Sequence, residues 1–225
     1  MGWTRPHFEI ARGNTALLVI DMQRDFIAPG APYECASGRE MIEKLNELIA
    51  ACREAELPIV FTAQMHHPDG SDLGTVQHLH PLTATGEALR EGTPGVELYP
   101  EIDARPTDRL IHKRRYSAFF GTDLDLLLRS LGVEVLIVGG VATNVCCDST
   151  IRDAFFRNYK PIVLSDGNAT LGLPDTGWGE LTAEQVHAAT LSTVSVFFGE
   201  VASVADVVER VRAATPAPAR PPVNV

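Results

Sequence analysis

Three side chains that can do covalent chemistry follow apolar segments of the chain. Asp21 and Lys113 each come directly after a short apolar segment. A third such segment ends in two glycines, Gly139 and Gly140, and Cys146 follows a few residues later. Continuous apolar segments are typical of strands covered on both faces. Because the carboxyl ends of parallel strands meet at one edge of a sheet, we expect the acid, the amine and the thiol to converge there.

Together these three residue types suit the cleavage of an acyl–nitrogen bond. A cysteine in the first turn of a helix feels the positive end of the helix dipole, and a nearby Lys113 ammonium would lower the thiol pKa further. The thiolate would attack a carbonyl, and the Asp21 carboxylate would take the thiol proton and pass it to the leaving amine. Backbone N–H groups of the turn before Cys146 would hold the oxyanion, so we expect a thioester intermediate.

Each of the three residues also has a structural interpretation. An aspartate after a strand is often a solvated turn or a helix cap, a lysine there is usually exposed, and a helical cysteine is usually a small core residue. The functional interpretation therefore depends on the three occurring together. Within the helix, Cys147 falls on the apolar stripe with Ile151, Ala154 and Phe155, which predicts that Cys146 is the nucleophile and Cys147 a packing residue.

The segments that must position these side chains alternate between strand and helix patterns. We predict strands at 16–20, 58–62, 109–112, 133–138, 161–164 and 194–198. We predict helices at 40–56, 123–131, 146–158, 183–191 and 201–213. Strand–helix–strand alternation at this spacing indicates parallel strands joined by crossover helices. The expected fold class is α/β, with one open sheet and helices on both faces.

The rest of the chain divides into an irregular excursion and a tail. Residues 64–108 have little periodicity, apart from a possible helical turn at 87–90, and an excursion this long usually forms a lid or a substrate wall. Residues 215–225 are rich in proline, which predicts a disordered tail. We find no repeat and no second domain, so we expect a single domain over 1–214.

Composition excludes several classes of partner. The 225 residues carry a net charge of −10, which argues against nucleic acid or an anionic membrane surface as partners. No apolar stretch approaches the roughly 20 residues that a bilayer-spanning helix needs, and residues 1–12 do not resemble a secretory signal. The four cysteines form no CxxC pair and no zinc-type spacing, so we expect reduced thiols and a cytoplasmic protein.

Four stretches of the sequence resemble the isochorismatase-like cysteine hydrolases. They are LLVIDMQRDF at 17–26, GTPGVELYPEI at 92–102, HKRRYSAFFGTDLDLLLR at 112–129 and GGVATNVCCDSTIRDAFF at 139–156. Within that family, the last two look most like ureidoacrylate amidohydrolases and related ureide-cleaving enzymes. The resemblance implies a Rossmann-like three-layer α/β/α fold with a central, mainly parallel six-stranded sheet. It also implies an Asp-Lys-Cys triad, which falls on Asp21, Lys113 and Cys146.

The resemblance carries further expectations about the site. In relatives the peptide bond at the positions of Val141 and Ala142 is cis, and the N–H groups of Ala142 and Cys146 would form the oxyanion hole. For substrate binding we expect contributions from Phe26, Gln64, Arg115 and Tyr116. Relatives are commonly dimers or tetramers, so we expect a homo-oligomer.

The sequence also departs from two branches of the family. Nicotinamidases carry metal ligands in a T-x-D-x-H pattern, and here Gln64 replaces the acid within the stretch 62–66. We therefore expect no metal site and interpret His66, His67, His78 and His80 as polar loop residues. Members that act on isochorismate itself lack the cysteine, so Cys146 argues against that branch.

These observations predict a hydrolase that acts on non-peptide C–N bonds and needs no organic cofactor. It would attack a small ureide, carbamoyl or amide substrate and release ammonia. Two alternatives stay open: a nicotinamidase-like aromatic amidase, and a non-catalytic binding module on the same fold.

Overall fold

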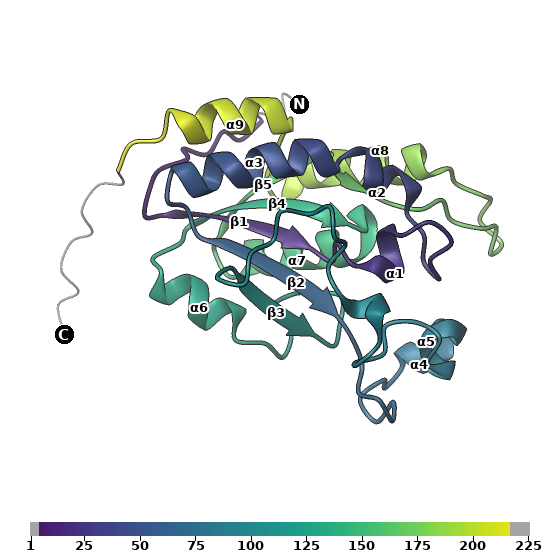
Figure 1. The fold of residues 1–225 in the computed structure, drawn as a ribbon. Helices are drawn as coiled ribbons and strands as arrows, with labels where there is room; N and C mark the ends of the chain where they lie inside the picture. Colours follow the sequence, from purple (N-terminus) through teal and green to yellow (C-terminus); the bar gives the residue numbers. More distant parts are fainter. Residues whose placement is uncertain (1–4, 217–225) are drawn as a thin grey trace.

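A parallel sheet forms the centre of the computed structural model, which describes residues 5–216 (Figure 1). The strands lie in the order β3-β2-β1-β4-β5-β6, and each neighbouring pair is parallel. Their bounds are Thr15–Ile20 (β1), Ile59–Gln64 (β2), Arg109–Lys113 (β3), Val135–Val141 (β4), Lys160–Ala169 (β5) and Glu200–Ala202 (β6).

Helices cover both faces of this sheet and make the three-layer α/β/α fold that the sequence predicts. Helices α3 (Ile42–Glu54) and α9 (Val204–Arg212) pack side by side on one face, on the opposite side of the sheet from α6 (Leu124–Ser130) in Figure 1. Helices α7 (Asp148–Phe156) and α8 (Ala183–Phe197) share the apolar layer with α6. No helix of the described residues is long and apolar enough to cross a bilayer.

The central strand β1 explains why its sequence is apolar without alternation. All six of its residues are buried, because Leu17 and Val19 face one apolar layer while Ala16 and Leu18 face the other. A strand covered on both faces excludes water from both of its side-chain rows. Asp21, the first residue after β1, therefore lies at the buried carboxyl edge of the sheet.

The carboxyl edge is covered by short elements. They are α1 (Arg24–Ile27), α2 (Ala36–Glu40), α4 (Val76–Leu79), α5 (Pro81–Thr85), the 3₁₀ turn Pro94–Val96 and the π-helical turn Thr143–Cys147. Helices α4 and α5 lie in the excursion and extend beyond the end of the sheet in Figure 1. The predicted helical turn at 87–90 is wrong, because those residues form an irregular loop and the excursion's helices come earlier.

The predicted strand at 194–198 is also wrong. Residues 194–197 form the end of α8, which continues past the predicted end at 191, and the sixth strand is Glu200–Ala202. Between them, Gly199 lies so close to β5 that a Cβ atom there would be 2.5 Å from the Pro161 carbonyl oxygen. A short apolar run is compatible with either a strand or a buried helix end, so its pattern alone does not distinguish them.

The remaining element boundaries differ by a few residues. Helix α9 begins at Val204 rather than 201, because the Ser203 side chain accepts a hydrogen bond from the Asp206 amide and caps the helix. The helix predicted at 146–158 is preceded by the π-helical turn and ends at Phe156. The predicted tail 215–225 lies outside the described residues from 217 onward.

Candidate active site

A buried ion pair joins the ends of β1 and β3. The Lys113 Nζ atom lies 2.7 Å from Asp21 Oδ2, and both side chains are fully buried. The Thr62 hydroxyl on β2 donates a hydrogen bond of 2.6 Å to Asp21 Oδ1. Apart from the ion pair, Oδ2 has no hydrogen-bond partner among the described residues. This carboxylate oxygen is therefore free to accept a further proton donor.

Cys146 reaches the same point from the turn that follows β4. Its Sγ atom lies 3.3 Å from the Gln64 side-chain oxygen, and that oxygen also accepts a 3.0 Å hydrogen bond from Lys113 Nζ. Since an ammonium can only donate, the atom facing Lys113 must be the amide oxygen. The structure thus brings together Asp21, Lys113 and Cys146 from three strand ends, with Gln64 from a fourth.

The charge state of the thiol differs from the sequence-based expectation. Complete burial raises the pKa of Cys146 to about 12, and the Asp21 charge adds to this rise, while Lys113 opposes it. The predicted lowering of the thiol pKa is therefore wrong for the unliganded site. For Lys113, burial favours the neutral amine, but the facing Asp21 and Cys146 charges outweigh it and raise the pKa. The site therefore holds a neutral thiol beside the Lys113–Asp21 ion pair.

Backbone geometry explains how the strand ends approach so closely. Gly140 has φ +127°, and a Cβ atom there would lie 2.0 Å from the Ile20 carbonyl oxygen. Only glycine allows β4 to come this near to β1, at the residue before Asp21. Asp21 itself has φ +50°, in a region that non-glycine residues seldom adopt.

Gln23 holds the end of β2 in place, and sequence reasoning missed it. Its side-chain NH₂ group donates 2.9 Å hydrogen bonds to the backbone carbonyl oxygens of Gln64 and Val96. Its side-chain oxygen accepts a 2.8 Å hydrogen bond from the backbone N–H of Gln64. The two bonds to Gln64 fix its backbone beside Lys113 and Cys146, and the bond to Val96 ties the 3₁₀ turn to the same point. The available signal was the glutamine two residues after Asp21 in the first motif.

A cavity of about 130 Å³ opens onto the Cys146 thiol. Its lining combines aromatic, aliphatic and uncharged polar side chains: Phe26, Tyr33, Gln64, Val76, His80, Thr83, Leu89, Tyr116, Ala142, Val145, Cys146 and Leu171. Three of the four residues predicted to bind substrate, Phe26, Gln64 and Tyr116, are among them.

Arg115, the fourth residue predicted to bind substrate, is not part of the lining. Its guanidinium donates hydrogen bonds to the backbone carbonyls of Asp72, at 2.9 Å, and Arg114, at 2.6 Å. The preceding Arg114 bonds to the Met65 carbonyl and to the Glu91 carboxylate, each at 2.9 Å. Both arginines therefore hold the excursion against β3, which the local sequence did not reveal because their partners in the excursion lie more than twenty residues away.

Of the two predicted oxyanion residues, Ala142 directly precedes the turn that carries the thiol and Cys146 lies within it. The peptide bond between Val141 and Ala142 is cis. Ala142 and Cys146 both line the cavity, and the Ala142 carbonyl accepts hydrogen bonds from the Val145 and Cys147 amides. The turn is thereby closed at both its third and fifth residues, which fixes the Ala142 and Cys146 backbones relative to each other.

Cys147 lies in the apolar layer between the sheet and α7 and does not line the cavity. Burial raises the pKa of its thiol well above the ordinary value. Ile151 and Ala154 share this buried face, but Phe155 is 44% exposed, so the predicted apolar stripe ends one residue earlier. Phe155 instead contacts the Phe156 and Phe198 rings on the surface.

His66 and His80 lie outside the helices and strands, as the sequence predicts, but neither is an exposed polar residue. His66 is fully buried, and its ring nitrogens have no hydrogen-bond partner within residues 5–216, although Asp72 Oδ1 lies 3.4 Å from Nδ1. Burial lowers the pKa of His66 more than Asp72 raises it. His80 lines the cavity, where its Nε2 atom lies 2.8 Å from the Tyr116 hydroxyl.

The donors near His66 do not fit the metal site of nicotinamidases. The Gln64 side-chain oxygen is already bonded to the Lys113 ammonium and the Cys146 thiol, so a cation there would face a fixed positive charge. In the described part of the chain, no group of three or more His, Cys, Asp or Glu side chains is arranged to hold a metal ion.

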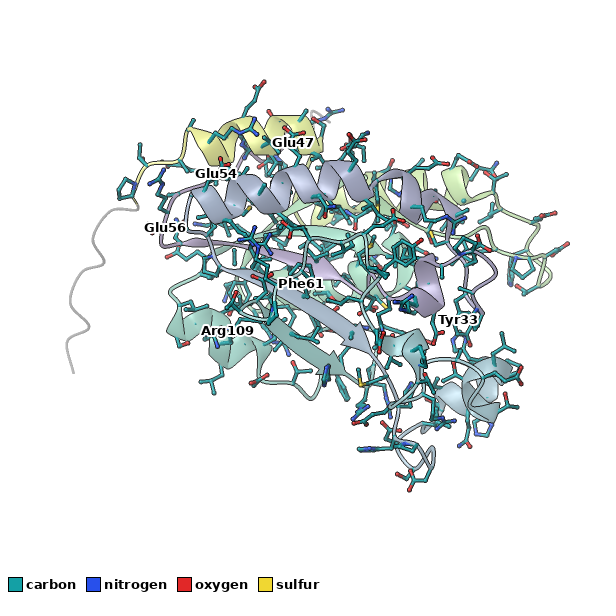
Figure 2. The ribbon with its side chains drawn as sticks, in the orientation of Figure 1. Tyr33, Glu47, Glu54, Glu56, Phe61 and Arg109 are labelled. Carbon is teal, nitrogen blue, oxygen red and sulfur yellow. The ribbon has the colours of Figure 1, made fainter. Side chains whose placement is uncertain are left out.

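Tyr33 completes the outer wall of the cavity and was also missed. Its hydroxyl lies 2.8 Å from Thr83 Oγ1, and its ring contacts Phe26 and His80. Figure 2 shows Tyr33 beside α1, near the α4–α5 segment, while Arg109 lies at the opposite end of the sheet. His80 belongs to the excursion and Tyr33 to the loop between α1 and α2, so both are found only when these segments meet over the strand ends.

Comparison with known proteins places this geometry in a family. A model of the isochorismatase domain matches residues 15–206. A ureidoacrylate amidohydrolase, RutB of Pseudomonas syringae pv. syringae (strain B728a), is 32% identical over 211 residues, which cover 86% of this chain and 82% of that protein.

Two solved structures are similar along most of the chain. The crystal structure of a cysteine hydrolase from Pseudomonas syringae pv. phaseolicola 1448A has a TM-score of 0.91 and 35% identity, covering 95% of this chain and 99% of that one. An isochorismatase-like hydrolase from Alkaliphilus metalliredigens has a TM-score of 0.74 and 32% identity, covering 87% of this chain and 98% of that one.

Proposed function

Because the chain belongs to the isochorismatase domain family of hydrolases, we propose that it is a cysteine amidohydrolase that cleaves a small ureide, carbamoyl or amide substrate and releases ammonia. The observation that carries this proposal is the meeting of Asp21, Lys113 and Cys146 at one end of a small cavity. A nucleophile, a base and a fixed positive charge within hydrogen-bond reach are what acyl transfer through a thioester requires.

In the proposed mechanism, Asp21 acts as the base because the resting thiol is neutral. When substrate enters, the Cys146 proton moves to Asp21 Oδ2 as Sγ bonds to the carbonyl carbon, and Lys113 stabilises the anionic state of the carboxylate–thiolate pair. The carbonyl oxygen becomes an oxyanion that the backbone N–H groups of Ala142 and Cys146 stabilise. No redox partner is needed, since the reaction is an addition followed by an elimination.

The intermediate then collapses in two steps. The C–N bond breaks, Asp21 returns its proton to the departing nitrogen, and ammonia leaves a thioester on Cys146. A water molecule gives a proton to Asp21 and attacks the thioester, and the regenerated thiol recovers that proton. The balance is one amide and one water converted to one acid and one ammonia.

The ureide type of substrate is the finer part of the proposal. Its support is the 32% identity to a ureidoacrylate amidohydrolase and the resemblance of the two long motifs around Lys113 and Cys146. The test is an ammonia-release screen over ureides, carbamoyl amino acids and aromatic amides, with Cys146→Ala as the blank. Ammonia from the wild type alone supports the proposal. No release from any substrate, with an unreactive Cys146, would favour a non-catalytic binding module.

One observation favours an aromatic amide as a second candidate substrate. The Phe26 and Tyr33 rings stack at 6.0 Å and line the cavity together with Tyr116, which suits a planar ring. The nicotinamidase-like alternative differs in its metal requirement. Nicotinamide turnover that is lost in EDTA and restored by zinc or iron would support that alternative, whereas turnover that survives EDTA fits the donor set around Gln64.

We also propose that the protein is a cytoplasmic homo-oligomer. The four cysteines are free thiols, which suits a reducing compartment. Phe155, Phe156 and Phe197 are 44%, 68% and 57% exposed on α7 and α8, an apolar surface typical of subunit contacts. Light scattering of the purified protein measures the oligomeric state.

A further inference from the structure

The cavity wall carries no charged carboxylate, ammonium or guanidinium side chain among the residues that the structure describes. Its polar groups are the Gln64 amide, the Thr83 hydroxyl, the His80 imidazole and the hydroxyls of Tyr33 and Tyr116. A buried carboxylate needs a cationic partner or several hydrogen-bond donors, because its loss of hydration is otherwise uncompensated. The composition of the wall therefore bears on the charge of the substrate.

Three cations that contact or adjoin lining residues are committed to other partners. The Lys113 ammonium is paired with Asp21 at 2.7 Å and also bonds to the Gln64 oxygen. Arg115 donates to the Asp72 and Arg114 carbonyls. On the excursion, Arg90 donates to the carbonyls of His67, at 2.7 Å, and Thr83, at 3.0 Å. A substrate carboxylate in the cavity would have to compete with these partners for a counter-ion.

His80 does not supply the missing charge either. Its imidazole is partly buried against Tyr116 and Tyr33, and this burial lowers the pKa of His80 below its ordinary value. The ring is consequently neutral at and above neutral pH. A neutral imidazole and a phenol can orient an uncharged polar group by hydrogen bonds, but they add no net positive charge to the wall.

From the composition of this wall we propose that the site selects substrates that carry no negative charge. These are uncharged amides or ureides with a small apolar or planar substituent, which the site would prefer to ureido or carbamoyl acids. The inference rests on the proposed amidohydrolase function and narrows its substrate class. It separates this chain from the relative named for ureidoacrylate, since an acrylate is a carboxylate. The net charge of −10 acts in the same direction, because it disfavours the approach of anions.

The same wall would favour release of the acid product. An uncharged amide R–CO–NH₂ and water give R–COO⁻ and NH₄⁺, so a cavity without a cation binds the substrate better than the carboxylate it forms. Weak product inhibition by the matching carboxylic acid is therefore part of the expectation.

The first test compares matched substrates in the wild-type protein. Propylurea, 3-ureidopropionate and the methyl ester of 3-ureidopropionate share one ureide and differ at the far end of the chain; butyramide and succinamate form a second pair. Assays at about pH 8 keep His80 neutral, and about 0.5 M salt screens the long-range field of the protein. We expect kcat/KM for the uncharged members, the ester included, to exceed that for the acids by more than about tenfold. Equal or better turnover of the acids would overturn the inference.

A second test needs no turnover. Iodoacetamide and iodoacetate alkylate thiols by the same displacement of iodide, but only iodoacetate is an anion. We expect the ratio of the iodoacetamide rate to the iodoacetate rate at Cys146 to exceed the same ratio at an exposed thiol on the same fold by about tenfold or more. The reference is Ser130→Cys in a Cys146→Ala background, with adducts mapped by mass spectrometry. Equal ratios at the two thiols would contradict the inference.

A positive charge placed on the wall should weaken the preference for uncharged molecules. Leu171 is a partly exposed lining residue, so Leu171→Lys can put an ammonium at the cavity, and Leu171→Met is its uncharged control of similar length. We expect Leu171→Lys, but not Leu171→Met, to reduce the ratio of the alkylation rates with iodoacetamide and iodoacetate. It should likewise reduce the ratio of kcat/KM for propylurea to kcat/KM for 3-ureidopropionate. The two proposals fail differently: an inactive protein that still excludes iodoacetate refutes only the amidohydrolase function, whereas an active protein that prefers acids refutes only the charge selection.

Discussion

The Lys113–Asp21 pair keeps two charges buried at the end of the sheet and so determines what the neighbouring thiol can do. Burial holds Cys146 in its neutral form, while the cation opposes that effect and the carboxylate stays available as a proton acceptor. The thiolate therefore forms only as substrate arrives. This differs from a permanently ionised cysteine, and it protects the thiol from oxidation and alkylation in the resting protein.

Replacement of Lys113 by methionine should remove this balance. Lys113 lowers the pKa of the Cys146 thiol, so without this cation the pKa rises further and the thiolate fraction at neutral pH falls. We expect turnover to drop by about 10²–10⁴-fold and alkylation by iodoacetamide to slow. The unpaired Asp21 should also lower the free energy of unfolding by about 3–5 kcal/mol. The rate of iodoacetamide labelling measures the change at the thiol, and urea denaturation measures the free energy of unfolding.

The double variant Asp21→Asn with Lys113→Met separates chemistry from folding. Removal of both charges should restore much of the lost unfolding free energy, because no unpaired carboxylate remains buried. Turnover should be absent in the double variant, since no base is left. If Lys113→Met alone alkylates as fast as the wild type, Lys113 does not influence the thiol.

The two adjacent cysteines should behave differently. Cys146→Ala should leave a folded protein without detectable turnover. Cys147→Ala, in the apolar layer, should lower the unfolding free energy by about 1–2 kcal/mol and keep most activity. Mass spectrometry of the thioester trapped with a slow substrate identifies the nucleophile. An adduct on Cys147 would contradict both the mechanism and the motif assignment.

The close approach of β4 to β1 brings the thiol-bearing turn beside Asp21. This approach depends on Gly140, where a side chain would meet the Ile20 backbone. The turn then begins at Thr143, two residues beyond the end of β4. A small shift of β4 relative to β1 would move Sγ away from the carboxylate while leaving most of the sheet intact.

Gly140→Ala should therefore be far more disruptive than an ordinary glycine substitution. We expect it to lower the unfolding free energy by more than about 3 kcal/mol, from backbone strain and the contact with Ile20 combined. Gly92→Ala is the matched control: Gly92 also has a positive φ, of 85°, but nothing lies within 4 Å of its added Cβ. The control should lose only about 1–2 kcal/mol. Similar thermal unfolding of the two variants would refute the steric argument.

The outer surface of α7 and α8 presents an aromatic cluster that the monomer leaves exposed. Phe156 contacts the Phe155 and Phe198 rings and is 68% exposed, and the Arg152 guanidinium lies 4.4 Å from the Phe198 ring centroid. Helix α8 has only Val186 and Val194 buried among its fifteen residues, despite an apolar composition. A second subunit is the partner that we propose for this surface.

Phe156→Ser should weaken that assembly without altering the site. We expect the mass measured by light scattering to fall toward the 24.4 kDa of one chain as the protein is diluted. Leu126→Ser, at an isolated exposed leucine on α6, is the control and should leave the assembly unchanged. A variant Phe156→Ser with the wild-type mass would exclude this surface from the subunit contact.

The strands β1 to β5 and the convergence of Asp21, Lys113 and Cys146 could be predicted from the sequence. Strands buried on both faces need continuous apolar residues, and the first polar residue after such a run marks the carboxyl edge of a parallel sheet. These signals are local, because each depends on a few consecutive residues. The same is true of the Gln64 substitution, which stands within a recognisable short motif.

Only the tertiary structure determined the features that depend on distant contacts. The run 194–198 ends a helix because α8 packs through Val194, and Arg115 is engaged by a carbonyl 43 residues away. His80 reaches the cavity only when the excursion folds back over the strand ends, where it meets Tyr33 from the loop between α1 and α2. The neutral thiol of Cys146 likewise follows from complete burial, and burial is set by the packing of the whole molecule, which no local pattern encodes.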